Sequence, residues 1–124
     1  MKNPANRRKW QVEQEGDAAQ RREDALGPNP FLGYDRESLA MHLMSRGAYE
    51  IAETQFRRAI VVNPFEARFK WRLAWCLYRQ KQYAEAREWI EKALEEVPGD
   101  TESLQVRGMI EKALGREPVN HAKE

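Results

Sequence analysis

Apolar residues recur along residues 33–115 with the three- and four-residue spacing of helices that bury one face. The clearest set consists of Ala86, Trp89, Ile90, Ala93, Leu94 and Val97. A comparable set precedes it and consists of Leu39, Ala40, Leu43, Ala52, Phe56, Ala59 and Ile60. Gly47 and Asn63-Pro64 interrupt the pattern, because glycine marks turns and proline lacks the amide donor that a helix needs. The pattern predicts two helix pairs, at about 36–47 with 50–62 and about 68–80 with 84–96.

The two predicted pairs are related by a shift of 34 residues. At this offset Leu39, Ala40, Leu43, Tyr49, Ala52, Ala59 and Pro64 fall on Leu73, Ala74, Leu77, Tyr83, Ala86, Ala93 and Pro98. A period of this length is typical of a solenoid, in which each unit buries one face against its neighbour. Solenoids usually bind other molecules rather than catalyse reactions, so the period favours a binding protein.

These residues resemble the tetratricopeptide repeat family, which has small residues where two helices cross, an aromatic residue near the turn and a closing proline. The first unit supplies Ala40, Tyr49, Ala52, Phe56, Ala59 and Pro64. The second supplies Ala74, Tyr83, Ala86, Ile90, Ala93 and Pro98. The sequence departs from the family where Arg36 and Lys70 replace a preferred tryptophan and where Lys81 replaces a turn glycine. The resemblance implies an all-α, right-handed α-solenoid that holds peptides on its concave surface.

A third unit begins after Pro98 and is incomplete. Thr101 is a suitable N-cap for a helix that runs to Leu114, and Gly115 with Pro118 ends it. The expected apolar face of this helix consists of Val106, Met109, Ile110, Ala113 and Leu114. The expected polar face consists of Glu102, Ser103, Arg107 and Glu111. A helix with one polar face suits the end of a solenoid, so we expect a capping helix, a repeat domain at 33–118 and a flexible tail at 119–124.

Residues 1–32 form a charged N-terminal extension that has two interpretations. Asn29-Pro30-Phe31 stands one period before Asn63-Pro64-Phe65, which indicates that residues 17–26 are the remnant second helix of a degenerate half-repeat. Arg22, however, stands where such a helix should carry a large apolar residue. That substitution favours a charged, partly helical tail instead, and the sequence leaves both interpretations open.

The composition bears on whether the chain is a nucleic-acid-binding, membrane or secreted protein. Lys and Arg number 21 and Asp and Glu 20, so the net charge of +1 favours neither nucleic acid nor membrane as a partner. No apolar run is long enough to span a membrane, and none follows the basic N-terminus as a secretory signal requires. The single cysteine, Cys76, cannot form an internal disulfide. We therefore expect a cytoplasmic protein.

The sequence contains no pattern that is typical of catalysis. His42 and His121 lie far apart, and no nucleophile accompanies either of them at a known spacing. A glycine-rich phosphate loop and a cysteine–histidine cluster for zinc are also missing from the sequence. We expect neither an enzyme nor a bound cofactor or metal.

Residues 68–79 carry the strongest indication of function. One side of this predicted helix consists of Arg68, Trp71, Arg72, Trp75 and Arg79. The other side carries the repeated Leu73 and Leu77 and must be the packed one, so the first side is free to line a groove. The expected partner-binding residues are Tyr34, Met41, Met44, Arg68, Trp71, Arg72, Trp75, Arg79, Met109 and Lys112. Their expected partner is another protein or peptide, acidic and with apolar anchors.

Other interpretations of this surface stay open. Trp71 and Trp75 could be covered by the chain's own N-terminal segment, and the arginines could be paired with Glu37. The chain could also be a structural subunit of a larger assembly or of a homo-oligomer, because so short an array buries limited area. Nucleic acid is a weaker alternative, because residues 67–100 carry seven basic and six acidic residues.

Overall fold

The computed structural model describes residues 27–115, over which it contains five helices and no strand. The helices are α2 (Tyr34–Ser45), α3 (Tyr49–Val62), α4 (Ala67–Arg79), α5 (Tyr83–Glu96) and α6 (Thr101–Gly115). They confirm the two predicted helix pairs and the capping helix, within about two residues at each end. The predicted half-repeat at 17–26 and the tail at 119–124 lie outside the described residues.

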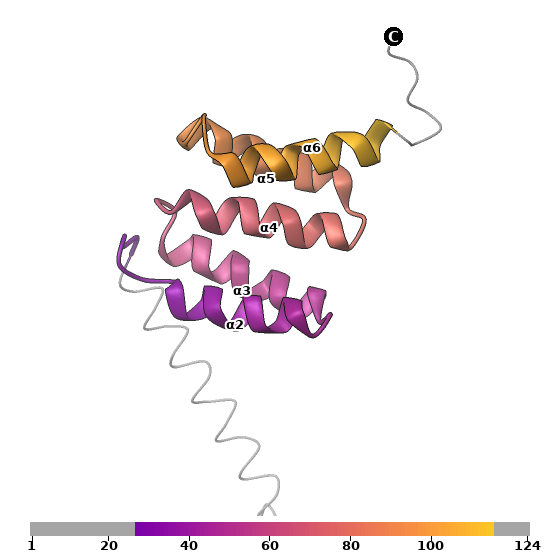
Figure 1. Ribbon diagram of the computed structural model, residues 1–124. Helices are drawn as coiled ribbons and strands as arrows, with labels where there is room; N and C mark the ends of the chain where they lie inside the picture. The colour runs from indigo at the N-terminus through magenta and orange to yellow at the C-terminus, as the bar shows by residue number, and fades with distance from the viewer. Residues whose placement is uncertain (1–26, 116–124) are drawn as a thin grey trace, which may run out of the picture.

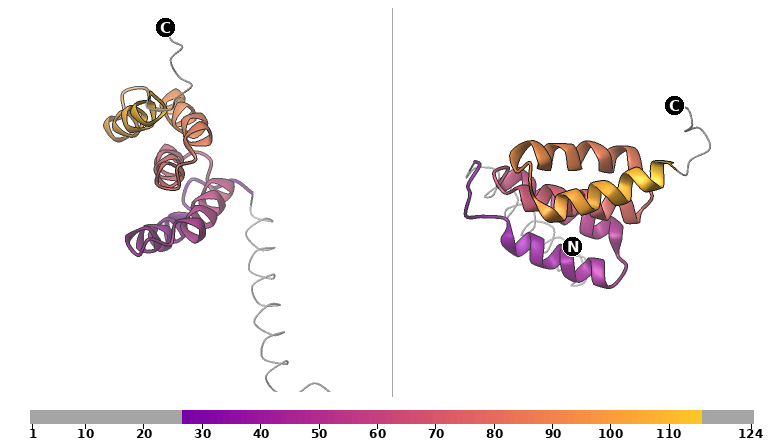
Figure 2. Two further views of the ribbon diagram at one scale, coloured as in Figure 1. Left: turned by 90° about the vertical axis from the view of Figure 1, so that its right-hand side faces the viewer. Right: turned by 45° about the horizontal axis from the view of Figure 1, so that its top comes forward.

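The helices form two layers. Helices α2, α4 and α6 lie side by side in one layer, and α3 and α5 lie behind them (Figure 1). The end-on view on the left of Figure 2 shows the same two layers. Each helix packs against the next along the chain, and α4 also contacts α6 directly. Over residues 27–115 this arrangement is an α-solenoid that runs from α2 to α6.

The core lies between the layers and follows the sequence period. The repeated alanines are fully buried and are Ala40, Ala52, Ala59, Ala74, Ala86 and Ala93. The large side chains without exposed surface are Phe56, Phe69, Leu73, Leu77, Ile90 and Ile110. Burying each of these large side chains contributes roughly 1.5–3 kcal/mol to stability. The small residues bring the helices close together, and the large ones fill the space between the crossings.

The turns inside the two helix pairs have one geometry although their residues differ. Gly47 has a φ of 77°, and Lys81, which stands one period later, has a φ of 64°. In both turns an amide donates back to the end of the preceding helix, from Gly47 to the Met44 carbonyl and from Lys81 to the Tyr78 carbonyl. A left-handed residue thus ends α2 and α4 in the same way. The departure from glycine at Lys81 changes the side chain and leaves the turn intact.

Several expectations for individual positions are wrong. Val97 was expected at the end of the buried stripe of the second pair and is 45% exposed, because it follows the last residue of α5. Leu39 was expected in the buried stripe and is 45% exposed, whereas its repeat partner Leu73 is fully buried. The reason is position, because Leu73 packs between successive units and Leu39 lies on the first helix of the described array. Ser103 was expected on the polar face and is fully buried, with its hydroxyl donating to Asp100 Oδ2 over 2.7 Å.

The start of α6 also differs from the expectation. Asp100, not Thr101, caps this helix, because Asp100 Oδ2 accepts the Ser103 amide over 2.9 Å. The buried Ser103 hydroxyl is satisfied by the same oxygen. Within residues 27–115, no helix has the length and apolar content that crossing a membrane requires.

Candidate functional site

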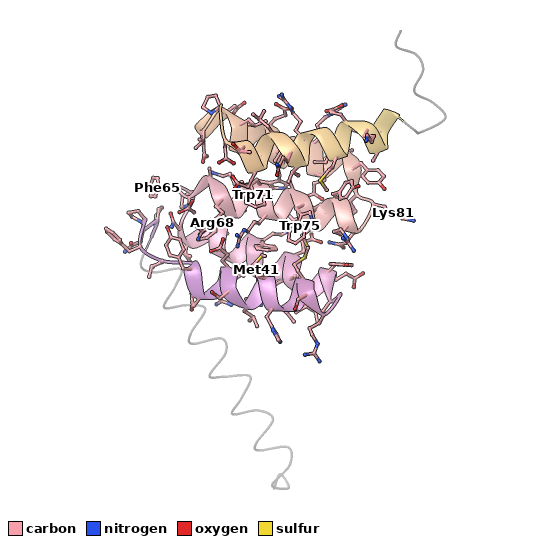
Figure 3. The ribbon with its side chains drawn as sticks, in the orientation of Figure 1. Met41, Phe65, Arg68, Trp71, Trp75 and Lys81 are labelled. Atoms are coloured by element: carbon pink, nitrogen blue, oxygen red, sulfur yellow. The ribbon has the colours of Figure 1, made fainter. Side chains whose placement is uncertain are left out.

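The layer of α2, α4 and α6 carries the predicted binding residues on its outer face. Figure 3 shows Arg68, Trp71 and Trp75 along α4 and Met41 between α2 and α4. Trp71 and Trp75 are half-buried, and each packs with one part against the core. Part of each indole is therefore held rigidly while the rest stays accessible to a partner. We call this surface, from Tyr34 on α2 to Lys112 on α6, the groove face.

The groove face has two halves, one at the N-terminal ends of α2, α4 and α6 and one at their C-terminal ends. The N-terminal half contains one buried carboxylate, which organises its polar contacts. Glu37 has a side chain that is 6% exposed, and it accepts two hydrogen bonds from Arg68, each over 2.6 Å. Arg72 Nη1 lies 3.0 Å from the same carboxylate. A bidentate arginine–carboxylate pair is among the stronger polar contacts in proteins, so Glu37 holds the start of α4 against α2. The expectation that Glu37 could pair with these arginines is confirmed.

This pairing changes what Arg68 and Arg72 can do. The hydrogen bonds to Glu37 raise the pKa of Arg68 above its ordinary value, so the guanidinium stays charged and bound. Arg72 also lies over the ring of Trp71, with 5.2 Å between the guanidinium carbon and the ring centroid. Both arginines thus fix the shape of the groove face, and Glu37 already neutralises part of their charge.

Tyr34 completes this half. Its hydroxyl donates to Glu66 Oε1 over 2.7 Å, and its ring stands edge-on to Phe69 at 5.2 Å between centroids. The hydrogen bond to the Glu66 carboxylate raises the pKa of Tyr34 above its ordinary value. A shallow hollow of about 320 Å³ beside Trp71 is lined by acidic as well as basic groups, including Asp100 and Glu102. The N-terminal half therefore carries no excess of positive charge.

The C-terminal half is different. A hollow of about 470 Å³, which we call the α2–α4 hollow, is lined by Met41, Met44, Ser45, Gly47, Tyr49, Trp75 and Arg79. Arg79 lies over the ring of Tyr49 at 5.3 Å and donates to the Tyr49 hydroxyl over 2.8 Å. The apolar part of the lining thus consists of the two methionines and Trp75. The only charged side chain in the lining is that of Arg79, which Tyr49 holds in place.

A second hollow lies across α4. This α4–α6 hollow has a volume of about 640 Å³ and is lined by Tyr78, Gln105, Gly108, Met109 and Lys112. Neither hollow has an acidic side chain in its lining. Within residues 27–115, neither Arg79 nor Lys112 forms an ion pair. The structure therefore concentrates uncompensated positive charge and apolar surface at the C-terminal ends of α4 and α6.

Nine of the ten predicted residues fall into three groups. Trp75, Met41 and Arg79 meet at the α2–α4 hollow, and Met109 with Lys112 line the α4–α6 hollow. Tyr34, Arg68, Trp71 and Arg72 lie in the N-terminal half. Met44 differs from the expectation of an accessible side chain, because it is only 6% exposed and belongs to the core. It forms part of the floor of the α2–α4 hollow and packs rather than projects.

Sequence reasoning missed Tyr49, Tyr78 and Gln105 as lining residues. The sequence period could have identified the last two. Tyr78 stands one period after Met44 and one before Lys112, and Gln105 stands one period after Trp71. Tyr49 was expected only as the aromatic residue near the turn, and no signal in the sequence places its hydroxyl beside Arg79.

The nucleophilic and metal-binding chemistry of the described residues is limited. Burial raises the pKa of the Cys76 thiol to about 11, so the reactive thiolate is disfavoured at neutral pH. Its sulfur lies 3.2 Å from the carbonyl oxygen of Tyr49, between α3 and α4. Among residues 27–115, no three histidine, cysteine or acidic side chains lie close enough to hold a metal ion.

Comparison with known proteins agrees with this architecture. The family model described as a tetratricopeptide repeat matches residues 38–101, which is just over half of the chain. No curated protein matches the sequence. The matched region runs from α2 through α5, where both helix pairs share their alanines, their turn geometry and their closing proline. The chain therefore belongs to the tetratricopeptide repeat family, whose repeats generally mediate interactions between proteins.

Proposed function

We propose that this protein is a non-catalytic adaptor that holds a segment of a partner protein across the C-terminal half of its groove face. The main support for the proposal is the pair of hollows on either side of α4. Each combines methionine and aromatic surface with one basic side chain, Arg79 or Lys112, that no carboxylate among the described residues neutralises.

The chemistry of the two hollows defines the partner segment. Methionine adapts its shape to irregular apolar groups, and a rigid tryptophan such as Trp75 is the type of residue that most often dominates binding energy. Apolar side chains of the partner fit the hollows, and its carboxylates complement Arg79 and Lys112. The partner segment is therefore acidic, with apolar anchors spaced to reach both sides of α4.

Arg68 and Arg72 have a different role in this proposal. Because both are paired with Glu37, their main role is to position Trp71 and the start of α4. Binding the carboxylates of the partner is secondary for them. Trp71 extends the apolar surface toward the N-terminal half of the groove face. Replacing Arg79 should consequently change the charge preference of binding more than replacing Arg68 does.

Selection from a random peptide library displayed on phage tests the proposal. The full chain should enrich peptides that combine apolar residues with aspartate or glutamate. For a synthetic copy of an enriched peptide, Trp75→Ala and Arg79→Glu should each weaken affinity by at least about tenfold, roughly 1.4 kcal/mol. Affinity should also fall as salt is raised, because Arg79 is exposed.

Matched controls lie on α5, away from the hollows. Trp89 is half-buried like Trp75, and Lys92 is exposed like Arg79. Trp89→Ala and Lys92→Glu should leave affinity for the enriched peptide within about twofold of the unmodified chain. The proposal fails if the library yields no enriched peptide, or if the α5 variants weaken binding as much as the groove variants.

A further inference from the structure

The N-terminal edge of the solenoid is formed by α2, which lies at one end of the stack (Figure 1). The side of α2 that faces away from the stack carries one stripe at helical spacing. The stripe consists of Asp35, Leu39 and His42 of α2 with Arg46, the C-cap residue that follows Ser45, and all of these residues are exposed. The buried residues of α2, Glu37, Ala40 and Met44, lie on the opposite side.

The next unit shows how this stripe behaves when it is covered. One period later, the same positions on α4 are Phe69, Leu73, Cys76 and Gln80. The first three are fully buried, and Cys76 and Gln80 contact Tyr49 and Glu53 of α3. In this fold the stripe is therefore a helix-packing surface, and within residues 27–115 nothing covers it on α2.

A second exposed apolar residue faces the same edge. Ile51 on α3 is 58% exposed. Its repeat partner on α5 is Glu85, which reaches back to the preceding unit and pairs with Arg57 over 2.7 Å. Ile51 thus points toward where a preceding unit would lie, as Leu39 does. A solenoid normally ends in a helix with a polar outer face, and this edge instead presents two aliphatic side chains.

The stripe on α2 is self-complementary. Asp35 and Arg46 lie equally far from its midpoint, and so do Leu39 and His42. When two copies of α2 pack antiparallel about a two-fold axis, Asp35 of each copy meets Arg46 of the other, and Leu39 of each meets the imidazole of the other's His42. Within residues 27–115, neither Asp35 nor Arg46 has an ion-pair partner of its own.

We propose that the α2 stripe is a self-association surface, through which a second copy of this chain binds as an antiparallel, two-fold symmetric dimer. Such an isologous contact closes on itself, because each copy supplies the same patch. The inference does not depend on the peptide-binding proposal. Met41 and Trp75 lie on the groove face rather than on the stripe, so the dimer would carry two open grooves.

Charge reversal in the full chain provides a direct test, read by sedimentation velocity over a range of concentrations. The unmodified chain should show a monomer–dimer equilibrium. Asp35→Arg and Arg46→Asp should each raise the dimer dissociation constant by at least about tenfold, because each places like charges opposite one another at both ends. A mixture of these two single variants should form a heterodimer, since every charged pair across that interface is again opposite.

The apolar centre needs a matched control. Leu39→Lys should abolish the dimer. Leu104→Lys on α6 is the matched control and should not, because Leu104 is similarly exposed, at 40% against 45% for Leu39, but lies outside the stripe. Recovery of the dimer on mixing excludes misfolding as the cause of its loss in the single variants. A chain that is monomeric at every concentration overturns the proposal, as does a dimer that the charge reversals leave unchanged. If the chain is a monomer and Leu39→Lys lowers its unfolding free energy, the stripe is covered by the chain's own residues 17–26. This result also overturns the proposal.

Discussion

Leu39 and Leu73 occupy the same position in consecutive repeats, yet the structure predicts different consequences when each is replaced by alanine. Leu73 is fully buried within the hydrophobic core. Leu39 is 45% exposed on the N-terminal edge. Both substitutions remove the same atoms from a helix, so their effects on helix propensity are equal. The difference between the two therefore isolates burial.

The expected magnitudes follow from the two environments. Leu73→Ala removes apolar area from the core and leaves a cavity, which costs roughly 3–5 kcal/mol of unfolding free energy. Leu39 has about half of its surface buried, so the loss is roughly half of the 1.5–3 kcal/mol for full burial, about 1 kcal/mol. Water fills the space that Leu39 leaves, and no cavity penalty is added. The two variants should thus differ by about 2–4 kcal/mol.

Urea denaturation followed by circular dichroism measures this difference. Both substitutions belong in the Arg46→Asp background, in which the proposed dimer is weakened, at protein concentrations where sedimentation velocity detects only the monomer. At slopes of about 1–3 kcal/mol per molar urea, the midpoints should differ by about 0.7–4 M. Equal costs at the two positions would contradict this prediction, because they would mean that Leu39 is covered within the monomer.

Three further predictions concern the turns, the thiol and the cap of α6. Lys81→Gly should stabilise the protein by up to about 1 kcal/mol, because Lys81 has a φ of 64°, whereas Gly47→Ala should destabilise it by a similar amount. A change of the opposite sign in thermal denaturation would contradict this. Cys76 should react with iodoacetamide at pH 8 far more slowly in the folded chain than in urea, because burial raises its thiol pKa to about 11; equal rates would show that the thiol is accessible. Asp100→Ala should cost about 1–2 kcal/mol in urea denaturation, since it removes both the cap and the partner of the buried Ser103 hydroxyl, and a neutral effect would reassign the cap to another residue.

Most of the fold could be predicted because its rules are local and repeated. Alanines at helix crossings, prolines between units and a period of 34 residues each act within a few turns of helix. The helix bounds were consequently correct within about two residues. The exposure of Leu39 could not be predicted in this way. A leucine at this repeat position is buried when a preceding helix pair packs against it, as at Leu73, and exposed when none does.

The candidate site was predictable only in part. The sequence indicates that Trp75 and Arg79 share a side of one helix. It cannot show that Tyr49, from a different helix, orients Arg79, or that Glu37 holds Arg68 and Arg72 together. These contacts join residues about 30 positions apart, between helices whose rotation about their own axes is set by packing.

The architecture of this protein follows from its sequence alone, because helix periodicity and repeated small residues restrict the chain to stacked helix pairs. Only the packing of the helices establishes which half of the groove face keeps its positive charge. Pairing with the buried Glu37 occupies Arg68 and Arg72, whereas Arg79 and Lys112 have no acidic group beside them in their hollows. The physical reason is that charge compensation depends on distances of a few ångströms between helices, which no spacing along a single helix encodes.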